Sequence, residues 1–109
     1  MKINIKATNL ELTSAIKNYI EKKIGSLEKF LKKIEAQSEI EAYVEISKIT
    51  RHHHKGEVFY AELNLNLPHK LLRLEEKSTN LYSAIDILKD KARAQISKIK
   101  SKTNLRKLK

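Results

Sequence analysis

The stretch from residue 39 to residue 67 decides the fold of this 109-residue chain, and it reads EIEAYVEISKITRHHHKGEVFYAELNLNL. Apolar and polar residues alternate in Ile40–Ile46 and again in Phe59–Leu67. Alternation with a period of two is typical of a strand that buries one face. The polar segment Thr50–Gly56 separates the two runs, as the loop of a hairpin would. The stretch therefore predicts two antiparallel strands with one face on a hydrophobic core.

Two further strands are predicted outside this stretch. Residues 1–8 alternate in the same way around Ile3 and Ile5, and residues 70–77 form a short apolar and charged run after the turn signal Pro68-His69. The N-terminal alternation is typical of a strand, because a signal peptide would place a charged segment before a continuous apolar block.

Two segments repeat apolar residues at steps of three and four, the spacing of one helix face. Thr13 and the segment Ser78–Asn80 supply candidate N-caps before them. Gly25 lies inside the first segment and is expected to mark close packing or a bend. The two apolar faces consist of Ile16, Ile20, Ile24, Leu27, Leu31 and Ile34, and of Leu81, Ile85, Leu88, Ala92, Ile96 and Ile99.

These elements predict an α+β fold of order β-α-β-β-β-α, a four-stranded sheet with two long helices packed on one face. Residues 1–102 are expected to form one domain and residues 103–109 a flexible basic tail.

The chain has no cysteine, which excludes disulfides and thiolate metal sites. It has no apolar run long enough to cross a bilayer. A cytoplasmic protein without cofactor is expected.

The net charge of +10 is distributed unevenly. Residues 13–34 carry six Lys and two Glu, residues 35–66 carry three basic and six acidic groups, and residues 81–109 carry nine basic and two acidic groups. The helices are therefore expected to form a basic face and the outward strand positions an acidic one. Helical geometry groups Lys22, Lys29 and Lys33 on the first helix, and places Lys91, Lys98 and Lys102 on one flank of the second helix and Lys89, Arg93 and Lys100 on the other.

Such a face favours a polyanionic partner. Nucleic acid is preferred to a membrane surface, because a chain this small needs both apolar helix faces for its core. The sequence has neither zinc-ligand spacing nor an aromatic platform for single-stranded bases. The remaining mode of nucleic-acid recognition is contact with the phosphates of structured RNA.

Two sets of residues invite a catalytic or metal-binding interpretation. His52–His54 and His69 could be metal ligands, but consecutive side chains point to alternate sides, so a polar loop is favoured. Asp86 and Asp90 could form an acid pair. Lys89 and Arg93 follow them at a spacing of three, and ordinary ion pairing on a helix surface explains them. No enzyme is predicted.

The segment Asn80–Asp86, NLYSAID, followed by Lys89-Asp90-Lys91 and Gln95, resembles the opening of the last helix in the ribosome hibernation-promoting factors. This family is also called the ribosome-associated inhibitor or sigma-54 modulation family. The segments Ile3–Ile5, Asn9–Ile16 and Leu27–Phe30 agree as well. The resemblance implies a fold similar to that of double-stranded RNA-binding domains. It also implies binding to 16S rRNA of the small subunit and to the 70S ribosome, in the channel for mRNA and tRNA, with inhibition of translation under stress or in stationary phase.

The resemblance implies that the residues in contact with RNA are Lys22, Lys23, Lys29, Lys89, Lys91, Lys98 and Lys100. Asn80 replaces the usual acidic residue, and Ala94 replaces an Arg commonly found before Gln95. The end at Lys109 makes the chain similar to the short type, which lacks a dimerisation domain and is expected to be monomeric when free. Two alternatives stay open: a general binder of structured RNA, and a regulator that acts on a protein partner.

Overall fold

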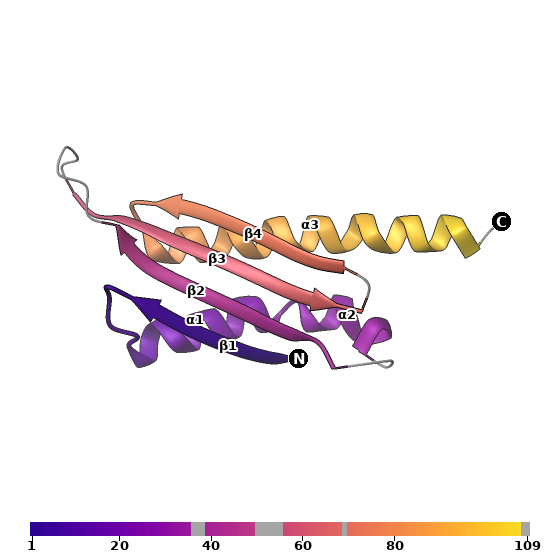
Figure 1. Ribbon diagram of the computed structural model, residues 1–109, viewed down its shortest axis with the longest axis horizontal. Coiled ribbons are helices and arrows are strands. Elements are labelled where there is room, and N and C mark those ends of the chain that lie inside the picture. The colour runs from indigo at the N-terminus through magenta and orange to yellow at the C-terminus, as the bar shows by residue number, and fades with distance from the viewer. Residues whose placement is uncertain (36–38, 50–55, 69, 108–109) are drawn as a thin grey trace.

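The computed structural model describes residues 1–35, 39–49, 56–68 and 70–107, with side chains at all of these positions except 35 and 102–107. Figure 1 shows a sheet with helices behind it. The elements are β1 (Lys2–Thr8), α1 (Ser14–Gly25), α2 (Glu28–Glu35), β2 (Glu41–Ile49), β3 (Val58–Leu67), β4 (Lys70–Ser78) and α3 (Leu81–Lys107). The prediction of an α+β fold with a four-stranded sheet is confirmed.

The strands follow one another across the sheet in the order β1-β2-β3-β4. β2 and β3 are antiparallel, with Val44 opposite Leu63, as the alternating pattern predicts. β1 runs parallel to β2, which makes the sheet mixed. Neighbouring parallel strands need a long crossover, and α1 and α2 supply it. The same face of the sheet also carries α3 (Figure 1).

The prediction of one continuous first helix is wrong, because the helix is interrupted between Gly25 and Glu28. Ser26 ends α1, and its hydroxyl donates to the carbonyl of Lys23 at 2.6 Å. Leu27 is nevertheless buried, so the apolar steps continue across the break. A Cβ at Gly25 would meet its nearest neighbour at an ordinary 3.9 Å. Gly25 therefore precedes a bend and does not mark close packing.

The two predicted N-caps are confirmed. The Thr13 hydroxyl accepts from the amide of Ile16 at 3.2 Å, and the Asn80 side-chain oxygen accepts from the amide of Ser83 at 3.2 Å. At the other end, α3 continues to Lys107, past the boundary expected at residue 102. Its last turns extend beyond the sheet (Figure 1).

The core lies between the sheet and the helices. No polar or charged residue is buried among the residues that the structure describes. No helix in the described ranges is long and apolar enough to cross a membrane. The buried residues are Ile20, Ile24, Leu27 and Leu31 from the first two helices and the loop between them, Leu81, Ala84, Ile85, Leu88, Ala92 and Ile96 from α3, and Ile40, Ala42, Val44, Ile46, Ala61, Leu63, Leu65 and Leu72 at or in the strands.

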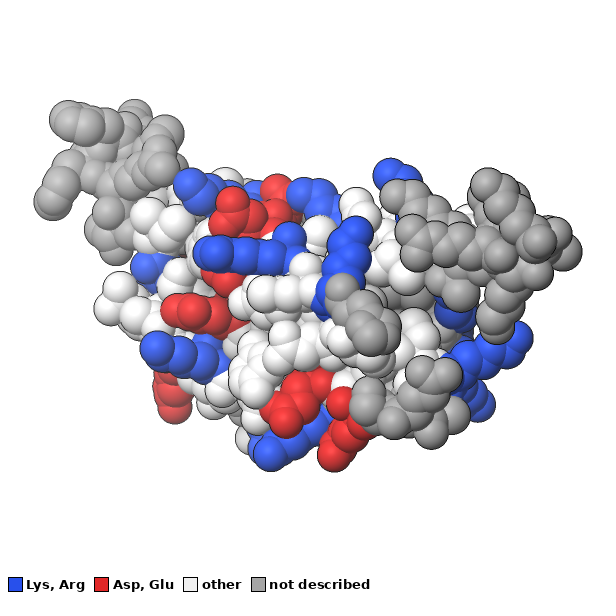
Figure 2. Space-filling view, turned by 45° about the vertical axis from the view of Figure 1, so that its right-hand side comes forward, with Lys and Arg blue, Asp and Glu red and all other residues white. Residues whose placement is uncertain are grey.

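The outer face of the sheet departs from the expected acidic surface. Its carboxylates are Glu41 and Glu45 on β2, Glu62 on β3 and Glu75 on β4, and its basic residues are Lys2, Lys6, Arg73 and Lys77 on the edge strands. The acidic side chains of the central strands are thus balanced by basic residues on the edge strands, and Figure 2 shows both signs on this side of the molecule. The face is mixed, because the edge strands β1 and β4 contribute basic residues beside the acidic central strands.

Hydrogen bonds hold part of these carboxylates in place. The Tyr60 hydroxyl lies 2.6 Å from a Glu62 oxygen and 2.8 Å from a Glu75 oxygen, and Arg73 Nε lies 3.3 Å from Glu62. Hydrogen bonds from Tyr60 and Asn64 lower the pKa of Glu62. Glu62 and Glu75 are therefore engaged within the sheet surface.

Candidate nucleic-acid interface

All ten candidate RNA-binding residues lie on α1, α2 and α3, on the side of the molecule away from the outer sheet face. Lys102 belongs to α3, but its side chain lies outside the described residues. The other nine fall into three sets according to what their side chains contact.

In the first set, each lysine pairs with a carboxylate. Lys23 Nζ lies 3.6 Å from Asp86, and Lys89 Nζ lies 3.0 Å from Asp90. Lys91 Nζ lies 2.7 Å from Glu76 on β4 and also reaches a backbone carbonyl of that strand. Lys91 thus ties α3 to the sheet. Part of its charge is neutralised before any ligand binds, and the same holds for the other two lysines.

In the second set, Lys22, Lys33 and Lys98 are exposed. Among the described side chains, none of these three forms an ion pair. Exposed Lys32 on α2 belongs with them but was not predicted, because its position around the helix differs from that of the three grouped lysines. This set is the part of the face most available to phosphates.

The third set surrounds the partly buried ring of Phe30 on α2, which was not predicted as a site residue. Lys29 Nζ lies 5.2 Å from the ring centroid, the Arg93 guanidinium carbon 4.8 Å and Lys100 Nζ 5.9 Å. These are cation–π distances. We call Phe30, Lys29, Arg93 and Lys100 the Phe30 cluster. Two of its cations come from α3, so the cluster joins α2 to α3.

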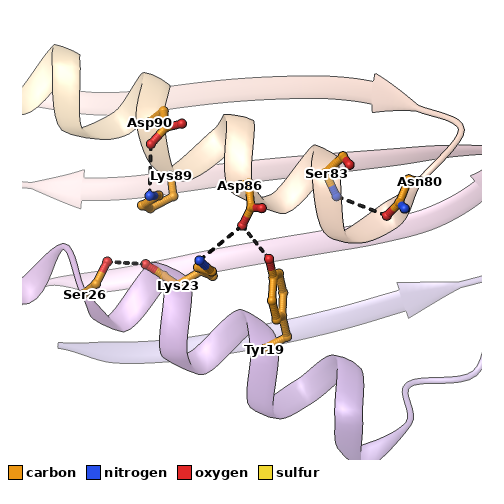
Figure 3. A network of polar contacts seen from close by, with 8 residues as sticks. All are labelled: Tyr19, Lys23, Ser26, Asn80, Ser83, Asp86, Lys89 and Asp90. Atoms are coloured by element: carbon orange, nitrogen blue, oxygen red, sulfur yellow. Dashed lines mark hydrogen bonds and ion pairs between the residues drawn. The ribbon is translucent and has the colours of Figure 1, made fainter.

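Asp86, near the start of α3, connects α3 to α1 (Figure 3). Its carboxylate accepts a hydrogen bond from the Tyr19 hydroxyl at 2.7 Å and pairs with Lys23. The predicted partners of the two aspartates are therefore wrong: Asp86 contacts α1, and Asp90 pairs with Lys89. A sequence cannot reveal the first of these, because the helices meet only in the folded chain. The rings of Tyr19 and Tyr82 meet edge to face at 4.7 Å between centroids.

The Asp86 contact predicts a pH dependence of stability. The hydrogen bond to Asp86, together with burial, raises the pKa of Tyr19 from 10.0 to about 12. Because the folded-state pKa is above the unfolded one, this stabilisation is complete below pH 10 and is lost as the pH rises through about 12. Urea unfolding between these pH values should show the loss, and Tyr19→Phe should show less of it. Equal losses in both proteins would contradict the assignment.

No group of three or more His, Asp or Glu side chains that could hold a metal ion is found within the described ranges. His52–His54 and His69 lie outside those ranges, so their role as loop residues stays a prediction.

The fold and this surface define a small α+β domain with a mixed four-stranded sheet and a basic three-helix face. Residues 3–104 match the family model described as Sigma 54 modulation protein / S30EA ribosomal protein. The chain belongs to this family, which confirms the resemblance found in its helical motif.

Curated relatives and solved structures agree with this assignment. The chain is 36% identical over 104 residues to a ribosome hibernation promotion factor of Lactococcus lactis, and 33% identical over 104 residues to one of Staphylococcus aureus. These matches cover 95% of the chain but 52% and 50% of the relatives, so the chain spans about half their length.

Among solved structures, the N-terminal domain of Thermus thermophilus Protein Y is 33% identical, with a TM-score of 0.74 over 91% of this chain and 99% of that one. A ribosomal subunit interface protein of Coxiella burnetii shares the fold, with 22% identity and a TM-score of 0.69 over 93% of this chain and 99% of that one. The likeness to a double-stranded RNA-binding domain stays a prediction.

Proposed function

We propose that this chain binds the ribosome and inhibits translation, as a factor that keeps idle ribosomes in hibernation under stress or in stationary phase. In this proposal the α1–α2–α3 face binds 16S rRNA in the channel of the small subunit that mRNA and tRNA use. The chain acts in the cytoplasm as a monomer when free, in the unit formed by residues 1–102, and it needs neither cofactor nor catalysis.

The observation that carries the proposal is the basic helix face, which combines the Phe30 cluster with the exposed lysines Lys22, Lys33 and Lys98, for which the described part of the chain offers no ion-pair partner. Phosphate contacts position a protein on RNA without reading its sequence. Such contacts suit a rigid, folded RNA channel, whose phosphates lie at fixed positions. The names of the relatives, ribosome hibernation promotion factor and ribosomal subunit interface protein, support the ribosome as the binding partner in this proposal.

Occupation of the channel would inhibit translation by exclusion. A domain that fills the path of mRNA and tRNA competes with both for the same phosphates and the same space. Inhibition should therefore weaken as the mRNA and tRNA concentrations rise, and it needs no chemical step.

Cosedimentation with purified 30S subunits and 70S ribosomes at physiological salt tests the proposal. We expect the chain to pellet with both particles, and saturating mRNA and tRNA to displace it. Free duplex RNA serves as the control ligand. A chain that bound the duplex but stayed at the top of the ribosome gradient would be a general RNA binder, and one that bound neither would point to a protein partner.

The three sets of lysines predict different salt dependences for single substitutions. Lys98→Ala should reduce the slope of log affinity against log salt concentration by about one unit, the value for one lost phosphate contact. Lys91→Ala should change the slope less but lower stability, because Lys91 holds Glu76 and lowers the pKa of that carboxyl. Ribosome filter binding at several salt concentrations and thermal unfolding measure the two effects. The opposite pattern would show that Lys91 faces the RNA.

A further inference from the structure

The Phe30 cluster brings three cationic groups together from two separate helices. Lys29 neighbours the ring on α2, and Arg93 and Lys100 approach it from α3. Each cationic group lies within 5.9 Å of the same ring centroid, so no two of them are more than about 11 Å apart. This upper bound exceeds the Debye length of about 8 Å at physiological salt, so salt weakens the repulsion between these groups without removing it.

No carboxylate relieves this repulsion within the described part of the chain. Each salt bridge there involves other basic groups, and Asp86 and Asp90 are engaged with Lys23 and Lys89. The negative face of the aromatic ring is the compensating feature that the structure shows. A ring quadrupole attracts cations weakly compared with a full anion, so the cluster is left with an excess of positive charge.

We propose that the Phe30 cluster is a discrete phosphate site, with one or two adjacent phosphodiester groups of the RNA backbone as its ligand and Phe30 as the residue that positions the cations. The site rests on the proposed function for the identity of its RNA. The partly buried ring packs against the core and therefore gives the cations a fixed point. Arg93 supplies a planar donor array that matches phosphate oxygens, and Lys29 and Lys100 supply compact charges on either helix.

This arrangement assigns different roles to residues of the same basic face. Lys22, Lys33 and Lys98 act as separate charges on flexible side chains. The Phe30 cluster instead forms a preorganised anion site, and it binds only where phosphates are held close together. It also makes binding depend on the α2–α3 contact, since its cations stand on both helices.

Phenylalanine-selective NMR labelling tests the site on the intact chain with inorganic pyrophosphate as the probe. The chain contains two phenylalanines, so Phe59 on β3 serves as an internal control. We expect a saturable shift of the Phe30 ring signals with the Phe59 signals unchanged. The double variant Arg93→Gln/Lys100→Gln should need at least ten times more pyrophosphate. No shift, or the same titration in the variant, overturns the proposal.

The positioning role of Phe30 is tested by the salt slope of ribosome binding. Phe30→Leu should lower the slope by about one unit, because Arg93 and Lys100 lose their common contact, whereas Phe30→Tyr should keep it. Phe59→Leu is the matched control for lost apolar packing. An unchanged slope in a folded Phe30→Leu variant overturns the positioning role. A wild-type chain that shows the pyrophosphate response but does not bind ribosomes would refute the proposed function and leave the phosphate site standing.

Discussion

Replacing Lys22, Lys33 and Lys98 together by Gln is expected to lower the slope of log affinity for ribosomes against log salt concentration by about two to three units, because each lost phosphate contact contributes about 0.7–0.9. These side chains are exposed, and among the described residues they form no ion pair. Their removal should therefore leave the fold intact and act on binding alone. Titration of fluorescent ribosomes at several salt concentrations measures the slope.

The outer sheet face offers a control with the same change in net charge. Lys2, Lys6 and Lys77 are also exposed, and they lie on the edge strands β1 and β4. Their joint replacement by Gln should leave the slope within a few tenths of the wild-type value. Equal reductions in both triple variants would mean that net charge alone drives binding, and a loss in the sheet-face variant only would place the RNA on the other side.

Replacing Leu88 by Ala is expected to destabilise the chain by about 2–5 kcal/mol. Leu88 is 0% exposed, where α3 packs over the sheet, so the substitution leaves a cavity between the helix and the strands. Ile87 is its neighbour on α3 and is 39% exposed. Ile87→Ala should cost less, about 1 kcal/mol, because the Ile87 side chain is open to water on one side and its truncation leaves no enclosed cavity. Urea unfolding followed by circular dichroism compares the two.

This pair of variants also separates folding from binding. At a temperature where Leu88→Ala is still fully folded, its salt slope with ribosomes should equal that of the wild type, because no phosphate contact is lost. Similar destabilisation by both substitutions would contradict the placement of the core against this face of α3.

Most of the fold could be predicted because local periodicity reports burial directly. The alternation in Ile40–Ile46 and Phe59–Leu67 gave the hairpin, and Thr13 and Asn80 gave the starts of two helices. The break between Gly25 and Glu28 could be predicted only as one of two meanings of Gly25, since the step from Ile24 to Leu27 is also the step of an uninterrupted helix.

The candidate site could be predicted only as a set of helix faces. Which lysine is neutralised depends on contacts between elements, such as Lys91 with Glu76 and Lys23 with Asp86. Phe30 follows the helical spacing of core residues, and its second role is visible only once α3 brings Arg93 and Lys100 beside it. Charge counting also overestimated the acidity of the sheet, since the edge strands contribute basic residues that the central segment does not contain.

A density map of the chain bound to the 70S ribosome tests the central claim most directly. We expect α1, α2 and α3 to lie against 16S rRNA in the mRNA and tRNA channel of the small subunit, with Lys22, Lys98 and the Phe30 cluster at phosphates and the outer sheet face turned away. A chain bound outside this channel, or bound with the sheet face against the RNA, would contradict it.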